Sequence, residues 1–254
     1  MEKETLPFNL EPLSRPEYRV SVILPVFSET DNVRDIVTFL ENSIQDCLEE
    51  IIIILSPYST SQSKKVCEEL ARQYGNVLVH TQICNPGLGY AEREGYELMR
   101  GNLMLRIDSD GEMEKETALR MLDEMERTNS ALVVASRWIP GGGFSEYNPL
   151  KYVLNWGFQQ IFRVLYRTHV HDLTYGFKLM RAELAKNIDW EGTLHEIACE
   201  TTFKPIRLGL KVSEVPTKWE ARVQGTSKNT LIGTFRYVSM AINILIKGVK
   251  TKSH

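Results

Sequence analysis

The chain holds little cysteine, and what it has is not arranged to bind zinc or to build a disulfide scaffold. Four of the 254 residues are cysteine, they are scattered, and no Cys-x-x-Cys pair occurs among them. Structural zinc sites and small secreted domains need closely spaced cysteines, so neither is indicated. We expect reduced thiols and a cytoplasmic location. The cysteines are Cys47, Cys67, Cys84 and Cys199.

Long apolar runs and an excess of one charge are also missing. The apolar run at Ile51–Leu55 is far too short to cross a bilayer, which takes about 20 residues. The opening MEKETLPFNL carries charges of both signs, so no signal peptide is expected. Thirty basic against 33 acidic residues give a net charge of −3, which argues against a general electrostatic grip on nucleic acid.

What the sequence does contain is a regular alternation of apolar runs and helical periodicity. Residues 1–18 hold three prolines and little periodicity, which indicates a surface arm. Beyond them, strands alternating with helices imply right-handed crossovers, and hence an α/β fold with a mainly parallel sheet. The expected strands are Val20–Leu24, Ile51–Leu55, Val77–Val79, Leu103–Ile107 and Ala131–Ala135, and the expected helices cover 33–44, 61–74, 88–99 and 115–127.

Three acids follow the fourth expected strand, at the sheet edge where ligands of parallel α/β folds gather. Asp108, Asp110 and Glu112 are spaced by two, so their carboxylates can converge on one small volume. Like charges brought together need a cation between them, and oxygen ligands suit Mg²⁺ or Mn²⁺, which could also bridge a diphosphate. The alternative interpretation is an acidic, solvated turn that caps the next helix.

Glycines mark two further connections at the same edge. Gly87 and Gly89 lie between the third strand and its helix, where they permit a close approach of the backbone. The helix N-terminus that follows offers amide donors to an anion. Three glycines at 141–143 could form a lid over the edge. Each stretch, taken singly, could equally be an ordinary connection.

Cations are placed near the same edge. Arg137 follows the fifth strand, and Arg222 and Lys228 stand six residues apart around a glycine. Basic side chains in these places could bind a phosphate or diphosphate. The alternative for the later pair is a solvated basic loop.

The C-terminal region predicts one more helix. Apolar residues recur there at intervals of four and three, and lysines flank them. Periodicity alone cannot separate a helix packed on the domain from one that lies on an anionic membrane, so both interpretations stay open. The apolar residues are Leu231, Phe235, Val238, Ile242 and Leu245.

In this order, the segments resemble the inverting nucleotide-sugar glycosyltransferases of family 2, most of all their dolichyl/polyprenyl-phosphate mannosyltransferase branch. The resemblance covers residues 19–230. It implies the GT-A fold, a Rossmann-like and mainly parallel sheet flanked by helices, in a single domain between an arm at 1–18 and an amphipathic helix and tail at 231–254. The matching segments are VILPVFSE at 22–29, NPGLGYA at 85–91, Gly95, Gly101, DSDGE at 108–112, SRW at 136–138, the glycines at 141–143, DLTYGFK at 172–178, EVP at 214–216 and RVQGTSK at 222–228.

The resemblance implies a GDP- or UDP-sugar as donor and a divalent cation as cofactor. Asp108 would contact the nucleoside and is also counted among the three acids expected at the cation. Asp110 and Glu112 would hold Mg²⁺ or Mn²⁺ at the diphosphate. The residues expected to line the donor pocket are Pro25, Phe27, Glu29, Gly87 and Gly89.

It also implies an acceptor, a polyprenyl phosphate at the cytoplasmic face of a membrane. Arg137 would bind the acceptor phosphate or the donor, and Lys151 would be a second cation on the acceptor side. Arg222 and Lys228 would close on the diphosphate. A phosphate is already an anion near neutral pH, so positioning and charge stabilisation would be enough for transfer. A sugar hydroxyl as acceptor would instead need a base, for which Asp172 is the first candidate and His171 the second.

One segment departs from the family pattern. After the second strand the family usually carries aspartates, one of which reads the nucleobase, whereas this chain has SPYSTSQS at 56–63. Ser56 could still bond a base, but without an ionised acceptor. A non-catalytic nucleotide-sugar binding protein therefore remains an alternative. A nucleotidyltransferase is a weaker one, because no glycine-rich, lysine-ended phosphate loop follows the first strand.

Overall fold

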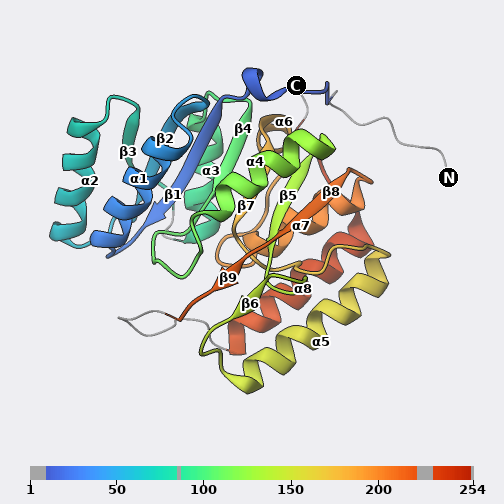
Figure 1. Ribbon diagram of the computed structural model, residues 1–254. Helices are drawn as coiled ribbons and strands as arrows, with labels where there is room; N and C mark the ends of the chain where they lie inside the picture. Colours follow the sequence, from blue (N-terminus) through green and yellow to red (C-terminus); the bar gives the residue numbers. More distant parts are fainter. Residues whose placement is uncertain (1–9, 85–86, 222–230, 253–254) are drawn as a thin grey trace.

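The computed structural model describes residues 10–84, 87–221 and 231–252, with the backbone alone for 231–234. A seven-stranded sheet in the order β3-β2-β1-β4-β7-β5-β8 forms the centre, with helices on both faces (Figure 1). The strands are β1 (Val20–Val26), β2 (Leu48–Leu55), β3 (Val77–Thr81), β4 (Leu103–Arg106), β5 (Leu132–Ser136), β6 (Gly143–Phe144), β7 (Lys178–Arg181), β8 (Val212–Pro216) and β9 (Lys218–Trp219). The helices are α1 (Asp31–Ser43), α2 (Ser61–Gln73), α3 (Leu88–Leu98), α4 (Thr117–Thr128), α5 (Pro149–Tyr166), α6 (Ala182–Asn187), α7 (Ile197–Arg207) and α8 (Leu231–Lys247).

The pairing confirms the expected α/β class and mainly parallel sheet. β1 runs parallel to β2 and β4, β2 runs parallel to β3, and β5 runs parallel to β8. β7 is the exception, because it lies between β4 and β5 and is antiparallel to both. The separate pair of β6 and β9 is parallel.

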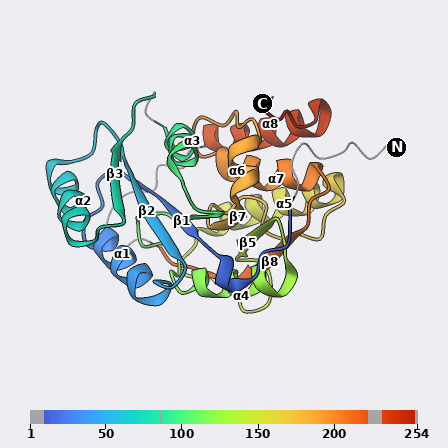
Figure 2. The same cartoon turned by 90° about the horizontal axis from the view of Figure 1, so that it is seen from above.

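The sheet is buried on both faces, which is why its strands read as unbroken apolar runs. Side chains alternate along β1: Val22 and Leu24 enter one core and Ile23 enters the other. Helices α1, α2 and α4 cover the first face, and α3, α6 and α7 cover the second (Figure 2). Helices α5 and α8 lie against α7 and against each other, outside the second layer.

The first strand is longer than expected, because it continues through Pro25 to Val26 instead of stopping before the proline. Pro25 stays in register with Ile54 of β2. Its missing N–H would point toward β4, whose ladder with β1 ends at the pair Ile23–Arg106. A proline therefore breaks no hydrogen bond at this position. The remaining four expected strands appear with ends shifted by at most three residues, the largest shift being the start of β2 at Leu48.

Helix α8 answers the question that its periodicity left open. The predicted stripe is divided: Phe235 is 72% exposed and Ile242 is 41% exposed, whereas Val238 packs against the second core and Leu245 is half-buried. The residues of the helix that are buried in that core are Ala241 and Ile244. The helix therefore packs on the domain and shows an apolar surface as well. None of the helices in the described ranges has the length and apolar character to cross a membrane.

Candidate active site

The acidic segment that follows β4 forms a turn tied to β1 and α1. The Ser109 hydroxyl donates to the Pro25 carbonyl at 2.7 Å, and the Asn32 amide donates to the Asp110 carbonyl at 2.8 Å. Gly111 has φ of +78°, and a Cβ there would meet the Asn32 amide nitrogen at 2.8 Å. Glycine is therefore required for the turn to close against α1.

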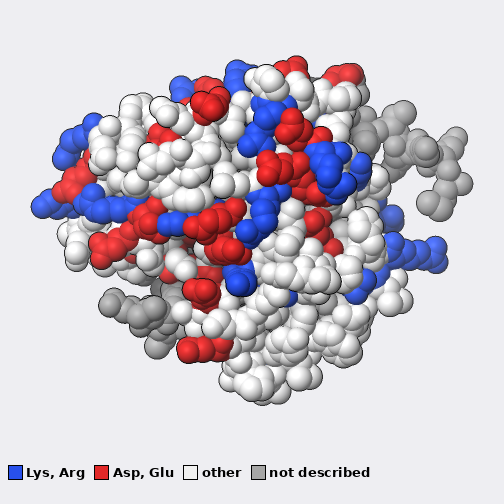
Figure 3. Space-filling model, viewed as in Figure 1, with Lys and Arg blue, Asp and Glu red and all other residues white. Residues whose placement is uncertain are grey.

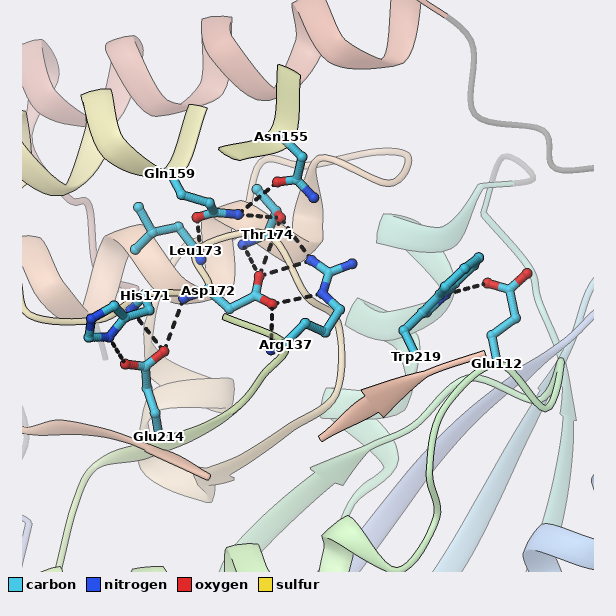
Figure 4. A network of polar contacts seen from close by, with 10 residues as sticks. All are labelled: Glu112, Arg137, Asn155, Gln159, His171, Asp172, Leu173, Thr174, Glu214 and Trp219. Carbon is cyan, nitrogen blue, oxygen red and sulfur yellow. Dashed lines mark hydrogen bonds and ion pairs between the residues drawn. The ribbon is translucent and has the colours of Figure 1, made fainter. Parts of the chain in front are cut away.

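The three acids of this turn have different partners. Asp108 Oδ1 lies 2.6 Å from Arg106 Nη2, whereas Asp110 Oδ1 accepts the Glu112 N–H at 3.0 Å. Glu112 Oε2 accepts the indole N–H of Trp219 at 3.0 Å (Figure 4). Each carboxylate is thus oriented by a separate donor, from β4, from the turn itself and from β9.

These partners limit how the turn could hold a cation. Over the described residues, no three His, Cys, Asp or Glu side chains are grouped as a metal site. Asp108 is balanced by a guanidinium, whereas Asp110 and Glu112 are half-buried neighbours whose hard oxygens suit Mg²⁺ or Mn²⁺. The residues present therefore fit a divalent ion at Asp110 and Glu112 better than at all three acids.

Arg106 links the turn to a buried acid that the sequence analysis did not single out. Its Nε lies 2.9 Å from Glu92 Oε1, and Glu92 also accepts the Tyr96 hydroxyl at 2.8 Å. Arg106 and Glu92 are both almost completely buried. Burial opposes the charge of Arg106, but Asp108 and Glu92 outweigh it and raise the pKa of the guanidinium above its ordinary value. Asp108 is therefore held by a permanently charged group.

The residues expected at the nucleoside lie at the ends of β1 and β2. The Phe27 ring is exposed, and the Glu29 carboxylate accepts the N–H groups of Phe27 and Ser28, both at 2.8 Å. The Ser56 hydroxyl accepts the Tyr58 N–H at 3.2 Å. Glu29 and Ser56 thus accept hydrogen bonds within their own loops at the expected edge. Pro25 lies near the end of β1, where its carbonyl accepts the Ser109 hydroxyl.

Gly87 and Gly89 have a packing role that the sequence analysis did not foresee. A Cβ on Gly89 would lie 2.2 Å from the Gly192 carbonyl oxygen, and one on Gly87 would lie 2.5 Å from the Thr193 carbonyl oxygen. The Gly89 N–H donates to Thr193 at 3.1 Å. Glycine is required at both positions because the backbone at Gly192 and Thr193 passes against them. This requirement is separate from the close approach of a phosphate that the sequence predicts. The role of both residues in donor binding stays a prediction.

Arg137 and Asp172, expected to act separately, form one buried ion pair. Arg137 Nε and Nη2 lie 2.7 and 2.9 Å from the two Asp172 oxygens, and the Arg137 N–H also donates to Asp172 (Figure 4). Burial opposes the charge, but Asp172 outweighs it and raises the pKa of Arg137. The second base candidate, His171, has its Nδ1 2.9 Å from Glu214. Both candidate bases are therefore engaged by neighbouring side chains.

The remaining expected cations lie on α5 or outside the described ranges. Lys151 is exposed in the first turn of α5, where its N–H is capped by the Asn148 side chain at 3.1 Å. Arg222 and Lys228 lie outside the described residues, so their roles stay predictions. The three glycines lead into β6, and Gly141 has φ of +90°.

An aromatic cluster beside the acidic turn was missed by the sequence analysis. Four of its rings come from residues 138–152 and the fifth from β9, and neighbouring ring centres lie 4.8–5.4 Å apart. These aromatic residues have no regular spacing, so the sequence carries no periodic signal for the cluster. The aromatic cluster consists of Trp138, Phe144, Tyr147, Tyr152 and Trp219.

The described residues thus place an acidic turn at the carboxyl edge of a mainly parallel sheet, with an aromatic cluster beside it. Residues 21–189 match the family model Glycosyl transferase family 2, so the chain belongs to that family. The family expected from the sequence is confirmed.

Several relatives share most of the chain. A polyprenol monophosphomannose synthase of Mycolicibacterium smegmatis is 28% identical over 84% of this chain and 82% of its own. An undecaprenyl-phosphate mannosyltransferase of Micrococcus luteus is 25% identical over 83% and 87%. A dolichyl-phosphate β-glucosyltransferase of Trichomonas vaginalis is 28% identical over 96% and 77%.

Solved structures confirm the GT-A fold. A glucosyl-3-phosphoglycerate synthase from Mycobacterium tuberculosis, solved with Mn²⁺, uridine diphosphate and phosphoglyceric acid, superposes with a TM-score of 0.69. The match covers 93% of this chain and 87% of that one at 13% identity. At this identity the likeness establishes the fold alone.

Proposed function

We propose that the protein transfers a hexose from a nucleotide sugar to a polyprenyl phosphate, with inversion at the sugar carbon. The observation that carries the proposal is the contact between the acidic turn and an apolar acceptor side. Glu112 bonds Trp219, and the aromatic cluster leads from Trp219 to Tyr152 on the exposed helix α5. The names of the relatives, which include mannosyl- and glucosyltransferases acting on lipid phosphates, support the same acceptor class.

On the donor side, the acidic turn would hold the cation and orient the nucleoside diphosphate of the donor. Asp110 and Glu112 would hold Mg²⁺ or Mn²⁺, which supplies positive charge to the departing diphosphate when bound. Asp108, fixed by Arg106, would contact the nucleoside, with Phe27 and Glu29 beside it. Arg222 and Lys228 would add charge at the diphosphate, and Ser56 would take the place of the usual base-reading acid.

On the acceptor side, the buried pair of Arg137 and Asp172 favours a phosphate over a hydroxyl. Asp172 is completely buried and both of its oxygens are bonded, so it is poorly placed to remove a proton. A phosphate needs no such base. Arg137 would hold the residues of the acceptor side in place, because its N–H donates to Asp172 and its guanidinium lies over the rings of Phe144 and Tyr175. The exposed Lys151 would bind the acceptor phosphate.

The exposed apolar surface supports docking on a membrane. Of the sixteen large apolar side chains exposed in the described residues, eight lie on α5 and three on α8. The face over α5 in Figure 3 shows few charged atoms. We define the apolar helix face as these residues: Leu150, Tyr152, Val153, Leu154, Trp156, Ile161, Val164, Leu165, Phe235, Ile242 and Ile246. With Lys151, Lys247 and Lys250 nearby, it would lie on an anionic membrane at its cytoplasmic face, where the lipid acceptor is found.

The test is transfer of labelled sugar from a panel of GDP- and UDP-sugars to a polyprenyl phosphate in detergent with Mn²⁺. We expect a lipid-linked product with one donor, and no product when the matching polyprenol without phosphate replaces the acceptor. Absence of product from every donor, or equal product from the free alcohol, would overturn the proposal.

A non-catalytic nucleotide-sugar binding protein remains a second candidate, favoured by the loss of acids at Ser56–Ser63. Such a protein would bind donor sugars and release no free sugar from them. Donor hydrolysis measured with and without Mn²⁺ separates the candidates, because an active transferase shows slow, cation-stimulated release.

A further inference from the structure

The loop between α6 and α7 lies against the glycine turn, residues 87–89, that opens α3. A Cβ on Gly89 would meet the Gly192 carbonyl oxygen at 2.2 Å, and the Gly89 N–H donates to the Thr193 carbonyl at 3.1 Å. Helices α3, α7 and α8 lie on the same side of the sheet (Figure 2). We call residues 192–195 the crossing loop; it lies beside the turn that is expected to approach the donor.

Two glutamates hold the crossing loop by its main chain. Glu200, in the first turn of α7, accepts the Gly192 N–H at 2.7 Å. Glu196, the residue before α7, accepts the N–H groups of Thr193 and Leu194 at 3.0 and 3.1 Å. Three consecutive N–H groups are thus bonded, so the start of α7 sets the position of the loop backbone.

Each glutamate is paired with a cation, and the two pairs differ in exposure. Glu200 lies 2.6 Å from Lys204, and both side chains are almost completely buried. Glu196 lies 3.1 Å from Arg236 Nη1 of α8, which also donates to the Thr193 hydroxyl at 3.3 Å. The Arg236 side chain is 45% exposed. Arg236 can therefore be replaced without opening the core, whereas Lys204 cannot.

The crossing loop ends in His195, whose side chain is exposed. No hydrogen bond among the residues that the structure describes engages its ring. The protein around the ring removes part of its solvation, and this desolvation lowers the pKa of His195 below its ordinary value. The ring is therefore largely neutral at pH 7, with one nitrogen that donates and one that accepts.

The charges that act on His195 place its ring beside the acidic turn. After desolvation, the largest influences on the pKa of His195 are the charges of Asp108 and Arg106, which bond each other. A neutral ring beside a carboxylate suits an uncharged ligand rich in hydroxyl groups better than it suits a phosphate. In a nucleotide sugar, that part is the hexose.

We propose that the His195 ring bonds a hydroxyl of the donor hexose and that Arg236 is the positioning residue that holds it there. The inference rests on the proposed function, which places the donor at the acidic turn. The nucleoside would lie at the ends of β1 and β2 and the diphosphate at the cation, so the hexose is the part that reaches the crossing loop. Without Arg236, both Glu196 and Thr193 lose a partner, and the loop that carries His195 is held less firmly.

The test compares nucleotide sugars with the same nucleotides lacking the sugar. Calorimetry on the full chain with Mn²⁺ uses UDP, UDP-glucose, GDP and GDP-mannose. His195→Ala should weaken binding of the nucleotide sugar that the wild type prefers about tenfold, which corresponds to about 1.4 kcal/mol and one lost hydrogen bond. The matching nucleoside diphosphate should bind as it does to the wild type. His195→Gln, whose amide both donates and accepts, should recover part of the loss.

Arg236→Ala should give the same selective loss at a smaller size, about threefold, and Arg236→Lys should recover it because an ammonium can still pair with Glu196. The double variant of His195→Ala and Arg236→Ala should bind no more weakly than His195→Ala alone, because Arg236 acts through His195. Both side chains are exposed, so these variants should fold. The matched control is Arg207→Ala, which removes an exposed guanidinium at the opposite end of α7 from Glu196 and should leave all four ligands unchanged.

The outcomes separate this contact from the reaction. Equal losses for a nucleotide sugar and its nucleoside diphosphate in His195→Ala, or unchanged binding of both, would show that His195 does not bond the hexose. Additive losses in the double variant would show that Arg236 does not act through His195. If the selective loss is found but no sugar reaches a polyprenyl phosphate, the contact stands and the proposed transfer fails. If neither nucleoside diphosphate binds the wild type, the donor site at the acidic turn and this inference are both wrong.

Discussion

The buried guanidinium of Arg106 neutralises the charge of Asp108, one of the three acids of the acidic turn. It lies between Glu92 and Asp108 at 2.9 and 2.6 Å, within the interior of the second core. Because one of three carboxylates is already neutralised, the cation expected here would meet the charge of Asp110 and Glu112 and less of Asp108. A single buried side chain thus distinguishes Asp108, which it pairs with, from Asp110 and Glu112.

Removing Arg106 should therefore destabilise the whole chain. Arg106→Met leaves the buried Glu92 carboxylate without its partner, and breaking such a pair costs about 3–5 kcal/mol. The free energy of unfolding, measured in urea at pH 7, should fall by that amount. Glu92→Gln combined with Arg106→Met should recover much of the loss, because the fully buried carboxylate is then neutral, while Asp108, which also loses its partner, is 31% exposed and can be solvated. Equal losses in the single and double variants would contradict this account.

The second prediction at this scale concerns the cation. Asp110→Asn should abolish Mn²⁺-stimulated donor turnover and weaken Mn²⁺ binding measured by calorimetry. Glu112→Gln should be milder, because an amide oxygen still coordinates. For each variant, donor turnover is measured after the cation is chelated and again after Mn²⁺ is restored, and the difference gives the Mn²⁺-stimulated part. Unchanged Mn²⁺ binding in Asp110→Asn would remove this residue from the cation site.

Among the elements, the two outer helices carry the surface that we assign to the membrane. Phe235→Glu on α8 and Val164→Glu on α5 place a charge on exposed positions of the apolar helix face. Each should reduce co-sedimentation with anionic liposomes about tenfold, since a buried apolar side chain contributes about 1.5–3 kcal/mol.

The matched control for the helices is Ile83→Glu, on the connection after β3 and outside this face. It should leave liposome binding unchanged. Deleting α8 would be less informative, because Ala241 and Ile244 belong to the core and their loss would expose it. Liposome binding that survives both helix variants would contradict the assignment.

Elements with a strong local pattern could be predicted, and those defined by distant contacts could not. The first five parallel strands are short apolar runs, so composition alone locates them. β7 reads Lys178-Leu-Met-Arg181, with a charge at each end, and is buried only because it is inserted between β4 and β5. The same reason hid the second partner of Arg106, since Glu92 lies fourteen residues earlier on another element.

For the whole molecule, a buried lysine links stability to pH. Lys178 is buried in the second core, where its ammonium donates to Thr201 at 2.6 Å and to the Ala198 carbonyl. Burial lowers the pKa of Lys178 to about 7. Above that pH the folded chain gives up a proton that the unfolded chain keeps until about pH 10.4.

The free energy of unfolding should therefore rise with pH above about 7, by up to about 1.4 kcal/mol for each pH unit from this group. Lys178→Met removes the titrating group and should flatten that slope. Chemical unfolding between pH 6.5 and 9.5 compares the two chains. If the free energy of unfolding varies with pH in the same way in the wild type and in Lys178→Met, then Lys178 keeps its ordinary pKa in the fold.

The acidic turn also contacts residues 219–220, which follow it by more than 100 positions in the sequence. Met113 forms a bridge with Trp219, and the Glu220 N–H donates to the Glu112 carbonyl at 3.1 Å. Contacts between residues so far apart in sequence form slowly, because a long loop must close first. The turn is therefore fully supported only after β9 has been synthesised and has folded back against it.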